Sequence, residues 1–88
     1  MANILVIDDE PSILESLNMF LTEKGHKIST ALTGARGLEL FSEQLFQVVI
    51  MDIRLPDANG LDILRIMIKE QKSSKIKEYG IRQAGSKG

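Results

Sequence analysis

The amino-acid sequence predicts an α/β fold in which helices cover both faces of a parallel sheet. Three observations support this prediction: short apolar runs are typical of buried strands, amphipathic segments of helical length separate them, and turn residues mark the boundaries. Helix-length connections between buried strands require parallel pairing and favour right-handed crossovers. We therefore expect a doubly wound α/β sheet built from strand-helix units within residues 1–71.

The first strand-helix unit occupies residues 3–25. Residues 3–7 (NILVI) form a continuous apolar run, as in strands that are buried on both faces of a parallel sheet. Pro11 suits the first turn of the next helix, and Asp9 or Glu10 ahead of it is a candidate cap. Gly25 is placed to end this helix.

The second unit begins with a weaker strand. Residues 26–32 (HKISTAL) alternate in polarity, which predicts a strand at an edge of the sheet. Thr33 is a candidate N-terminal cap for a helix over residues 34–44.

The third unit contains the most apolar segment of the chain. Residues 46–53 (FQVVIMDI) are strongly apolar, contain β-branched side chains and predict the third strand. Residues 56–60 (PDANG) predict a turn, and residues 61–70 predict a third helix.

Residues 72–88 differ in kind from the rest of the chain. They carry a net charge of +4, whereas residues 1–71 carry −5. No apolar run long enough for a core strand follows residue 71, so we expect a domain over 1–71 and a basic tail over 72–88 without strands of the sheet. The alternative is that residues 75–81 form a short strand beside the third strand, within one chain or by exchange between chains.

Composition excludes several classes of protein. The chain of 88 residues has no cysteine, which excludes disulfides and thiolate metal sites. No apolar stretch approaches the roughly 20 residues that span a membrane, and no signal peptide is recognisable, so we expect a cytoplasmic protein without membrane contact. The basic tail lacks interleaved aromatic residues beyond Tyr79, so we expect no direct nucleic-acid binding.

Three carboxylates stand at the ends of the two most apolar strands. Ligands of open α/β sheets bind beyond the carboxyl ends of the strands, where the strand order reverses. If the first and third strands are neighbours, Asp8 and Asp9 meet Asp52 in one crevice. Clustered carboxylates either keep a proton or hold a cation, and their oxygen atoms suit Mg²⁺. Helix capping would explain Asp8 and Asp9 taken alone, but the position of Asp52 favours a magnesium site.

Two motifs resemble a known family. Residues 4–10 (ILVIDDE) and 48–62 (VVIMDIRLPDANGLD), at this spacing, are similar to the first three βα units of a response regulator receiver domain, the phosphoacceptor module of two-component signalling. The resemblance implies a flavodoxin-like (CheY-like) doubly wound parallel sheet with strand order 2-1-3, incomplete at about three βα units.

The resemblance also implies roles for individual residues. Asp52 matches the aspartate that accepts a phosphoryl group from a sensor histidine kinase or a phosphotransfer protein. Asp9 matches a direct Mg²⁺ ligand, and Asp8 matches the acid that holds the ion mainly through water. Arg54 matches the position whose backbone carbonyl completes the coordination of the metal.

Pro56 and Gly60 match the turn that shapes the loop beside this aspartate. We expect Gly60 to be needed either for an unusual φ angle or for close approach to the next helix. Both residues are therefore expected to contribute geometry to the site.

A complete receiver has five strands, and the fourth and fifth end in a Ser or Thr and a Lys that contact the phosphoryl group. Neither strand is found in the sequence, and no serine or lysine of the basic tail lies in a matching motif: Lys72, Ser73, Ser74, Lys75, Lys77 and Lys87. The resemblance thus implies a receiver truncated at its C-terminus. We expect slower phosphoryl transfer, because preorganised donors to the phosphoryl oxygens are missing. We also expect a free edge on the third strand and a homo-oligomer formed through that edge.

The function expected from the sequence is that of a phosphorelay receiver which takes a phosphoryl group on Asp52 with Mg²⁺, impaired by the missing strands and not a dedicated enzyme. One alternative is a phosphorylation-incompetent receiver fragment that acts only by self-association or protein pairing. Another is a magnesium-dependent phosphatase-like enzyme, which would need a substrate-binding cap for which the chain has no room.

Overall fold

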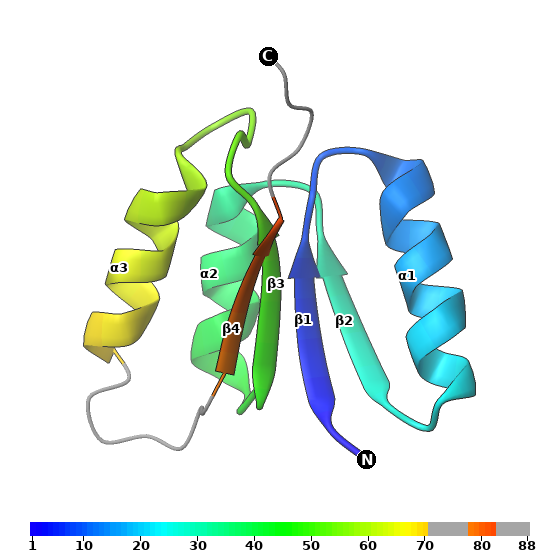
Figure 1. Ribbon diagram of the computed structural model, residues 1–88. Coiled ribbons are helices and arrows are strands. Elements are labelled where there is room, and N and C mark those ends of the chain that lie inside the picture. The colour runs from blue at the N-terminus through cyan, green and yellow to red at the C-terminus, as the bar shows by residue number, and fades with distance from the viewer. Residues whose placement is uncertain (71–77, 83–88) are drawn as a thin grey trace.

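The structure is a computed structural model that describes residues 1–70 and the backbone of residues 78–82. Its elements follow one another as β1 (Asn3–Ile7), α1 (Pro11–Glu23), β2 (Lys27–Ala31), α2 (Gly34–Glu43), β3 (Val48–Asp52), α3 (Gly60–Glu70) and β4 (Glu78–Arg82) (Figure 1). The strands form one parallel sheet in the order β2-β1-β3-β4. The predicted α/β class and the order 2-1-3 of the first three strands are confirmed.

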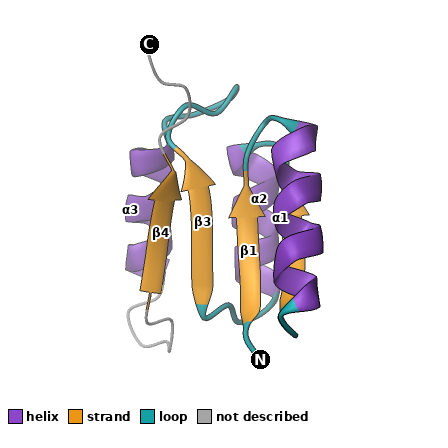
Figure 2. Cartoon of the chain, turned by 45° about the vertical axis from the view of Figure 1, so that its right-hand side comes forward, coloured by secondary structure: helices purple, strands orange, loops and turns teal. Residues whose placement is uncertain are grey.

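Helices lie on both faces of the sheet. Helices α2 and α3 pack on one face and α1 on the other (Figure 2). The side chains of β1 alternate between these faces: Leu5 and Ile7 belong to the larger core cluster, and Ile4 and Val6 belong to the smaller one. A strand covered on both sides needs apolar residues at every position, which explains the continuous run at residues 3–7.

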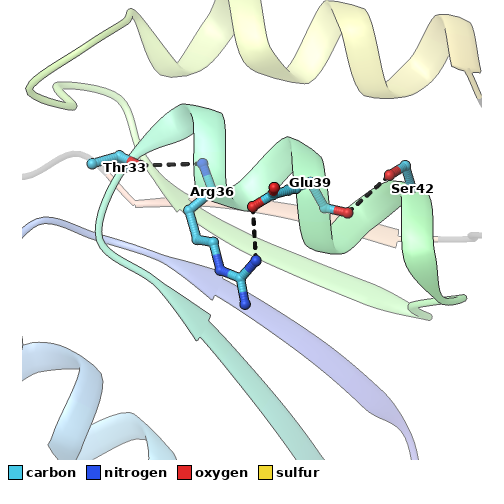
Figure 3. Close-up of polar contacts among 4 residues, drawn as sticks. All are labelled: Thr33, Arg36, Glu39 and Ser42. Carbon is cyan, nitrogen blue, oxygen red and sulfur yellow. Dashed lines mark hydrogen bonds and ion pairs between the residues drawn. The ribbon is translucent and has the colours of Figure 1, made fainter.

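Local sequence signals set the ends of the first two helices. Pro11 is the first residue of α1, and Gly25 follows its C-terminal end with a φ of +90°, a conformation that glycine adopts without a steric penalty. Thr33 is the N-terminal cap of α2, and its Oγ1 accepts a hydrogen bond from the Arg36 N–H at 3.1 Å (Figure 3). The sequence-based assignments of these three residues are confirmed.

Helix α2 approaches the sheet closely because it presents a glycine to β1. A methyl group on Gly37 would lie 2.3 Å from Cδ1 of Ile7, which is itself fully buried. The close approach places the start of α2 near the carboxyl end of the sheet.

The fourth strand corrects two expectations from the sequence. Residues 72–88 do contain a strand of the sheet, because Glu78–Arg82 pairs in parallel with β3. The edge of β3 is therefore paired with β4, and the structural basis for a homo-oligomer through a free β3 edge is lost. Among the alternatives, a short strand beside β3 within one chain agrees with the structure. Backbone hydrogen bonds to β3 hold this segment in the sheet. Such bonds do not depend on side-chain type, so the segment lacks the apolar run from which a buried strand is predicted.

No helix in the two described ranges of the chain has the length and apolar character needed to cross a membrane.

Candidate functional site

The predicted acidic cluster forms at the carboxyl end of the sheet. Ile7 of β1 pairs with Met51 of β3, so Asp8, which follows β1, and Asp52, the last residue of β3, lie at the same level of the sheet. Each of the three predicted acids offers a carboxylate oxygen, and these oxygens all lie within 4.8 Å of one another. Asp8 and Asp52 are each 2% exposed, whereas Asp9 is exposed. The structure thus brings Asp8, Asp9 and Asp52 together with one side open to solvent.

Backbone hydrogen bonds hold Asp8 at the junction of β1 and α1. Its N–H donates to the carbonyl of Ala31 in β2 at 3.0 Å, and its Oδ1 accepts from the Glu10 N–H at 3.0 Å. Glu10 is the N-terminal cap residue of α1, but its side chain makes no capping bond. The carboxylate that orders the start of α1 is therefore that of Asp8, two residues earlier than Glu10.

Asp52 organises the loop that follows it. Its Oδ1 accepts a hydrogen bond from the Arg54 N–H at 2.9 Å. Arg54 then pairs with Asn59 in an isolated antiparallel bridge, and the Gly60 N–H donates to the carbonyl of Ile53 at 2.6 Å. The loop between β3 and α3 is consequently a compact hairpin with Asp52 at its base. Arg54 thus lies beside Asp52, which it contacts through its backbone N–H.

Gly60 is required for close approach. A methyl group on this residue would lie 2.5 Å from the carbonyl oxygen of Asp52 and 2.7 Å from Cα of Ile53. Gly60 does not have a positive φ, which among the described residues occurs at Gly25. Of the two explanations offered by the sequence, close approach applies, but the neighbour is the backbone at the end of β3 and not the next helix, because Gly60 is itself the first residue of α3. Pro56 is exposed in the same loop.

The sequence did not indicate the role of Asp57, which it placed only in a turn. Its Oδ1 accepts from the Gly34 N–H at 2.8 Å, and its Oδ2 accepts from the Ala35 N–H at 2.9 Å. These bonds from the start of α2 hold the pKa of the Asp57 carboxyl below its usual value. No local motif could reveal the contact, because the partners lie 22 and 23 residues earlier in the chain.

The chemistry of the cluster fits a hard divalent cation. All three side chains are carboxylates, and two of them are almost fully buried. Oxygen ligands suit Mg²⁺, whereas zinc and copper sites typically include histidine nitrogen or cysteine sulfur. A bound cation would offset the repulsion between carboxylates that lie this close together.

The end of β4 lies beside the cluster. Arg82 pairs in register with Asp52, so the described part of this strand places neither a Ser, a Thr nor a Lys at that register position. The serines and lysines of the basic tail singled out above lie outside the described residues.

Comparison with known proteins gives a consistent result. Residues 4–80 match the family described as response regulator receiver domain. The transcriptional regulatory protein KdpE of Mycobacterium tuberculosis is 48% identical over 64 residues, which is 73% of this chain and 28% of KdpE. Protein PilH of Pseudomonas aeruginosa is 36% identical over 76 residues, which is 86% of this chain and 63% of PilH. The chain thus spans less than a third of KdpE and less than two thirds of PilH.

A solved structure has the same fold. Response regulator protein TrrA of Thermotoga maritima, in complex with Mg²⁺ and BeF, superposes with a TM-score of 0.80 at 32% identity, covering 97% of this chain and 90% of TrrA. TrrA has also been solved in complex with the histidine kinase ThkA, and that TrrA chain matches with the same TM-score and identity.

Proposed function

The chain belongs to the response regulator receiver domain family, and on that premise we propose that Asp52 accepts a phosphoryl group in a reaction supported by Mg²⁺. The observation that carries the proposal is the convergence of Asp8, Asp9 and Asp52 at the carboxyl end of β1 and β3, with their oxygens within 4.8 Å. The chain is then a phosphoacceptor in signalling and takes part in its own modification without being a dedicated enzyme.

The nucleophile in this proposal is Oδ2 of Asp52. The hydrogen bond that a described residue gives to this carboxylate comes from Arg54 and engages Oδ1, which orients the group and leaves Oδ2 for attack. A bond forms between Oδ2 and phosphorus while the phosphorus–nitrogen bond of a phosphohistidine breaks. The electron pair of that bond returns to the imidazole nitrogen, which takes a proton from solvent, and Asp52 becomes an acyl phosphate.

The proposed metal ligands are Asp9 and Asp52, the backbone carbonyl of Arg54, and Asp8 through water. Bound Mg²⁺ would neutralise negative charge on the oxygens of the transferring phosphoryl group. Because Asp9 is exposed while its two partners are buried, it marks the side of the cluster that opens to solvent. Pro56 and Gly60 shape the loop that carries the Arg54 carbonyl.

The proposed phosphodonor is a sensor histidine kinase or a phosphotransfer protein. TrrA, which is 32% identical in sequence to this chain, forms a complex with the histidine kinase ThkA whose structure has been solved. Because Arg82 stands in register with Asp52 where receivers carry a hydroxyl, we expect the transfer to be slower than in a receiver with the full set of donors. The alternative is a phosphorylation-incompetent fragment that acts only by self-association or protein pairing, and a free β3 edge does not support it, since β4 pairs with that strand.

Beryllofluoride tests the proposal, because it mimics an acyl phosphate on a competent aspartate. We expect ¹⁹F NMR to show a protein-bound beryllofluoride signal only when Mg²⁺ is present, and we expect Asp52→Asn to abolish the signal. Asp62→Asn is the matched control, because it removes one exposed carboxylate from the start of the neighbouring helix α3. A wild-type protein that gives no bound signal, or an Asp52→Asn variant that keeps it, would contradict the proposal.

A further inference from the structure

We infer that Asp57 is a positioning residue, which fastens the β3–α3 loop to the start of α2 and so holds the Arg54 carbonyl in place for the metal ion. The inference rests on the proposed function, because it assigns a task to a residue outside the acidic cluster. It concerns the loop between Ile53 and Gly60, which follows Asp52 directly.

Asp57 uses both carboxylate oxygens on another element. Oδ1 accepts from the Gly34 N–H at 2.8 Å, and Oδ2 accepts from the Ala35 N–H at 2.9 Å. These are the first two amide groups of α2, which have no partner within the helix. A carboxylate at the positive end of a helix is also favoured electrostatically. The pair of bonds therefore fixes both the position and the orientation of the Asp57 side chain.

Helix α2 already has a local cap, so Asp57 is not needed to start it. Thr33 satisfies the third amide, that of Arg36, and the Thr33 carbonyl accepts from the Gly37 N–H at 3.0 Å. Figure 3 shows the Thr33 hydroxyl directed at the Arg36 amide at the beginning of the helix. Thr33 caps the helix from within its own segment, whereas Asp57 binds the helix from the β3–α3 loop. The contact of Asp57 therefore holds the loop as well as the helix.

The site that receives Asp57 is shaped for close contact. A methyl group on Gly34 would lie 3.3 Å from Oδ1 of Asp57 and 2.9 Å from Cδ1 of the buried Ile63 in α3. A side chain at position 34 would therefore press on the Ile63 side chain and on the Asp57 carboxylate. The glycine allows the carboxylate to reach the amides directly.

The other polar anchor of the loop lies at its base. Oδ1 of Asp52 holds the Arg54 N–H, and Leu55 is buried in the larger core cluster at 9% exposure. The tip closes on itself through the bond from the Leu55 N–H to the Ala58 carbonyl at 3.2 Å. Asp57 is the tip residue whose side chain accepts hydrogen bonds from a different element, and Ala58 beside it packs against the larger core cluster. Removal of the Asp57 carboxylate would therefore loosen the tip while its apolar contact and the base stay attached.

The position of the loop matters for magnesium because this ion tolerates little departure from octahedral geometry. Groups that orient metal ligands typically change metal affinity by roughly 10–100-fold when they are removed. Because Asp57 is three residues from Arg54 and the base of the loop has its own anchors, we expect an effect near the lower end of this range.

The test compares Mg²⁺ affinity with stability in the full 88-residue chain. Mg²⁺ binding is followed by amide chemical shifts in NMR titrations, and stability is followed by urea unfolding. We expect Asp57→Ala to raise the apparent Kd for Mg²⁺ about tenfold. Thr33→Ala, which removes the local cap from the same helix, is expected to lower stability and to leave the Kd within about twofold of wild type. Asp62→Asn, which removes an exposed charge near the loop, is also expected to leave the Kd within about twofold.

Each outcome has a defined meaning. If the wild type binds Mg²⁺ and Asp57→Ala binds it as tightly, or loses no more affinity than Thr33→Ala or Asp62→Asn, Asp57 is only a helix cap and the inference is wrong. If the wild type does not bind Mg²⁺, the proposed function fails first and this inference falls with it. Should Asp57→Ala not fold, Asp57→Asn takes its place, because the amide oxygen can still accept from Gly34 while its nitrogen cannot accept from Ala35. That variant is expected to fold and to bind Mg²⁺ several-fold more weakly than wild type.

Discussion

Replacing Gly60 with alanine is expected to damage the candidate site through backbone displacement. The new methyl group would lie 2.5 Å from the carbonyl oxygen of Asp52 and 2.7 Å from Cα of Ile53. Ordinary carbon contacts begin near roughly 3.5 Å, so the start of α3 and the end of β3 must separate by about 1 Å. Backbone atoms cannot move aside by changing rotamer, so the cost lies within the usual range for overpacking, about 1–3 kcal/mol.

Gly25→Ala is the matched control for this variant. A methyl group on Gly25 meets no atom within 4 Å, but the φ of +90° is strained for alanine. That strain costs about 1–2 kcal/mol, far from the acidic cluster. The two variants should therefore lose similar free energies of unfolding for different reasons.

The assay combines urea unfolding with the beryllofluoride signal in ¹⁹F NMR. We expect both glycine variants to unfold at lower urea concentration than wild type. We expect only Gly60→Ala to need a several-fold higher Mg²⁺ concentration for half-maximal beryllofluoride binding. If Gly60→Ala is as stable as wild type, or binds beryllofluoride no more weakly than Gly25→Ala, the close approach of Gly60 to Asp52 does not position the site.

Three further predictions concern the core, the pH dependence and the metal. Phe46→Ala should lower the free energy of unfolding by about 3–5 kcal/mol, because this side chain lies in the core and is 1% exposed. Urea unfolding measures the loss, and a loss below about 1 kcal/mol would contradict the prediction. Asp57 has a pKa below its ordinary value of 3.8, so its stabilising contribution is present above that pH and lost as the pH falls through the lowered pKa. The Tm difference between wild type and Asp57→Asn should therefore shrink as the pH falls below 3.8, and a constant difference would refute this. Asp9→Asn should weaken Mg²⁺ binding, as measured by an NMR titration. Because Asp9 is exposed, the free energy of unfolding should change by less than about 0.5 kcal/mol. Unchanged Mg²⁺ affinity would count against the role of Asp9 as a ligand.

Features that depend on local sequence were predicted well. The apolar runs at residues 3–7 and 46–53 predict strands, because a strand that is buried on both faces requires continuous apolar side chains. Thr33 predicts the start of a helix, because its hydroxyl can accept a hydrogen bond from the backbone N–H three residues later, that of Arg36. The meeting of Asp8, Asp9 and Asp52 followed from parallel topology, which brings the carboxyl ends of neighbouring strands to one edge.

Features that depend on distant partners were not predicted, or, as with the strand beside β3, were offered only as an alternative. Glu78–Arg82 joins the sheet through backbone pairing with β3, and its side-chain pattern alone did not identify it as a core strand. The capping of α2 by Asp57 joins segments more than 20 residues apart, so neither segment carries a sign of the other. Both omissions concern hydrogen bonds made by main-chain groups, which every residue except proline can offer and which the sequence therefore does not encode locally.

Covalent modification of Asp52 tests the central proposal most directly. Intact-protein mass spectrometry after incubation with phosphoramidate and Mg²⁺ would detect the transfer. The proposal predicts that the wild-type chain gains the mass of one phosphoryl group only when Mg²⁺ is present, and that Asp52→Asn gains none. No gain in the wild type, or an equal gain in Asp52→Asn, would contradict the assignment of Asp52 as the phosphoacceptor.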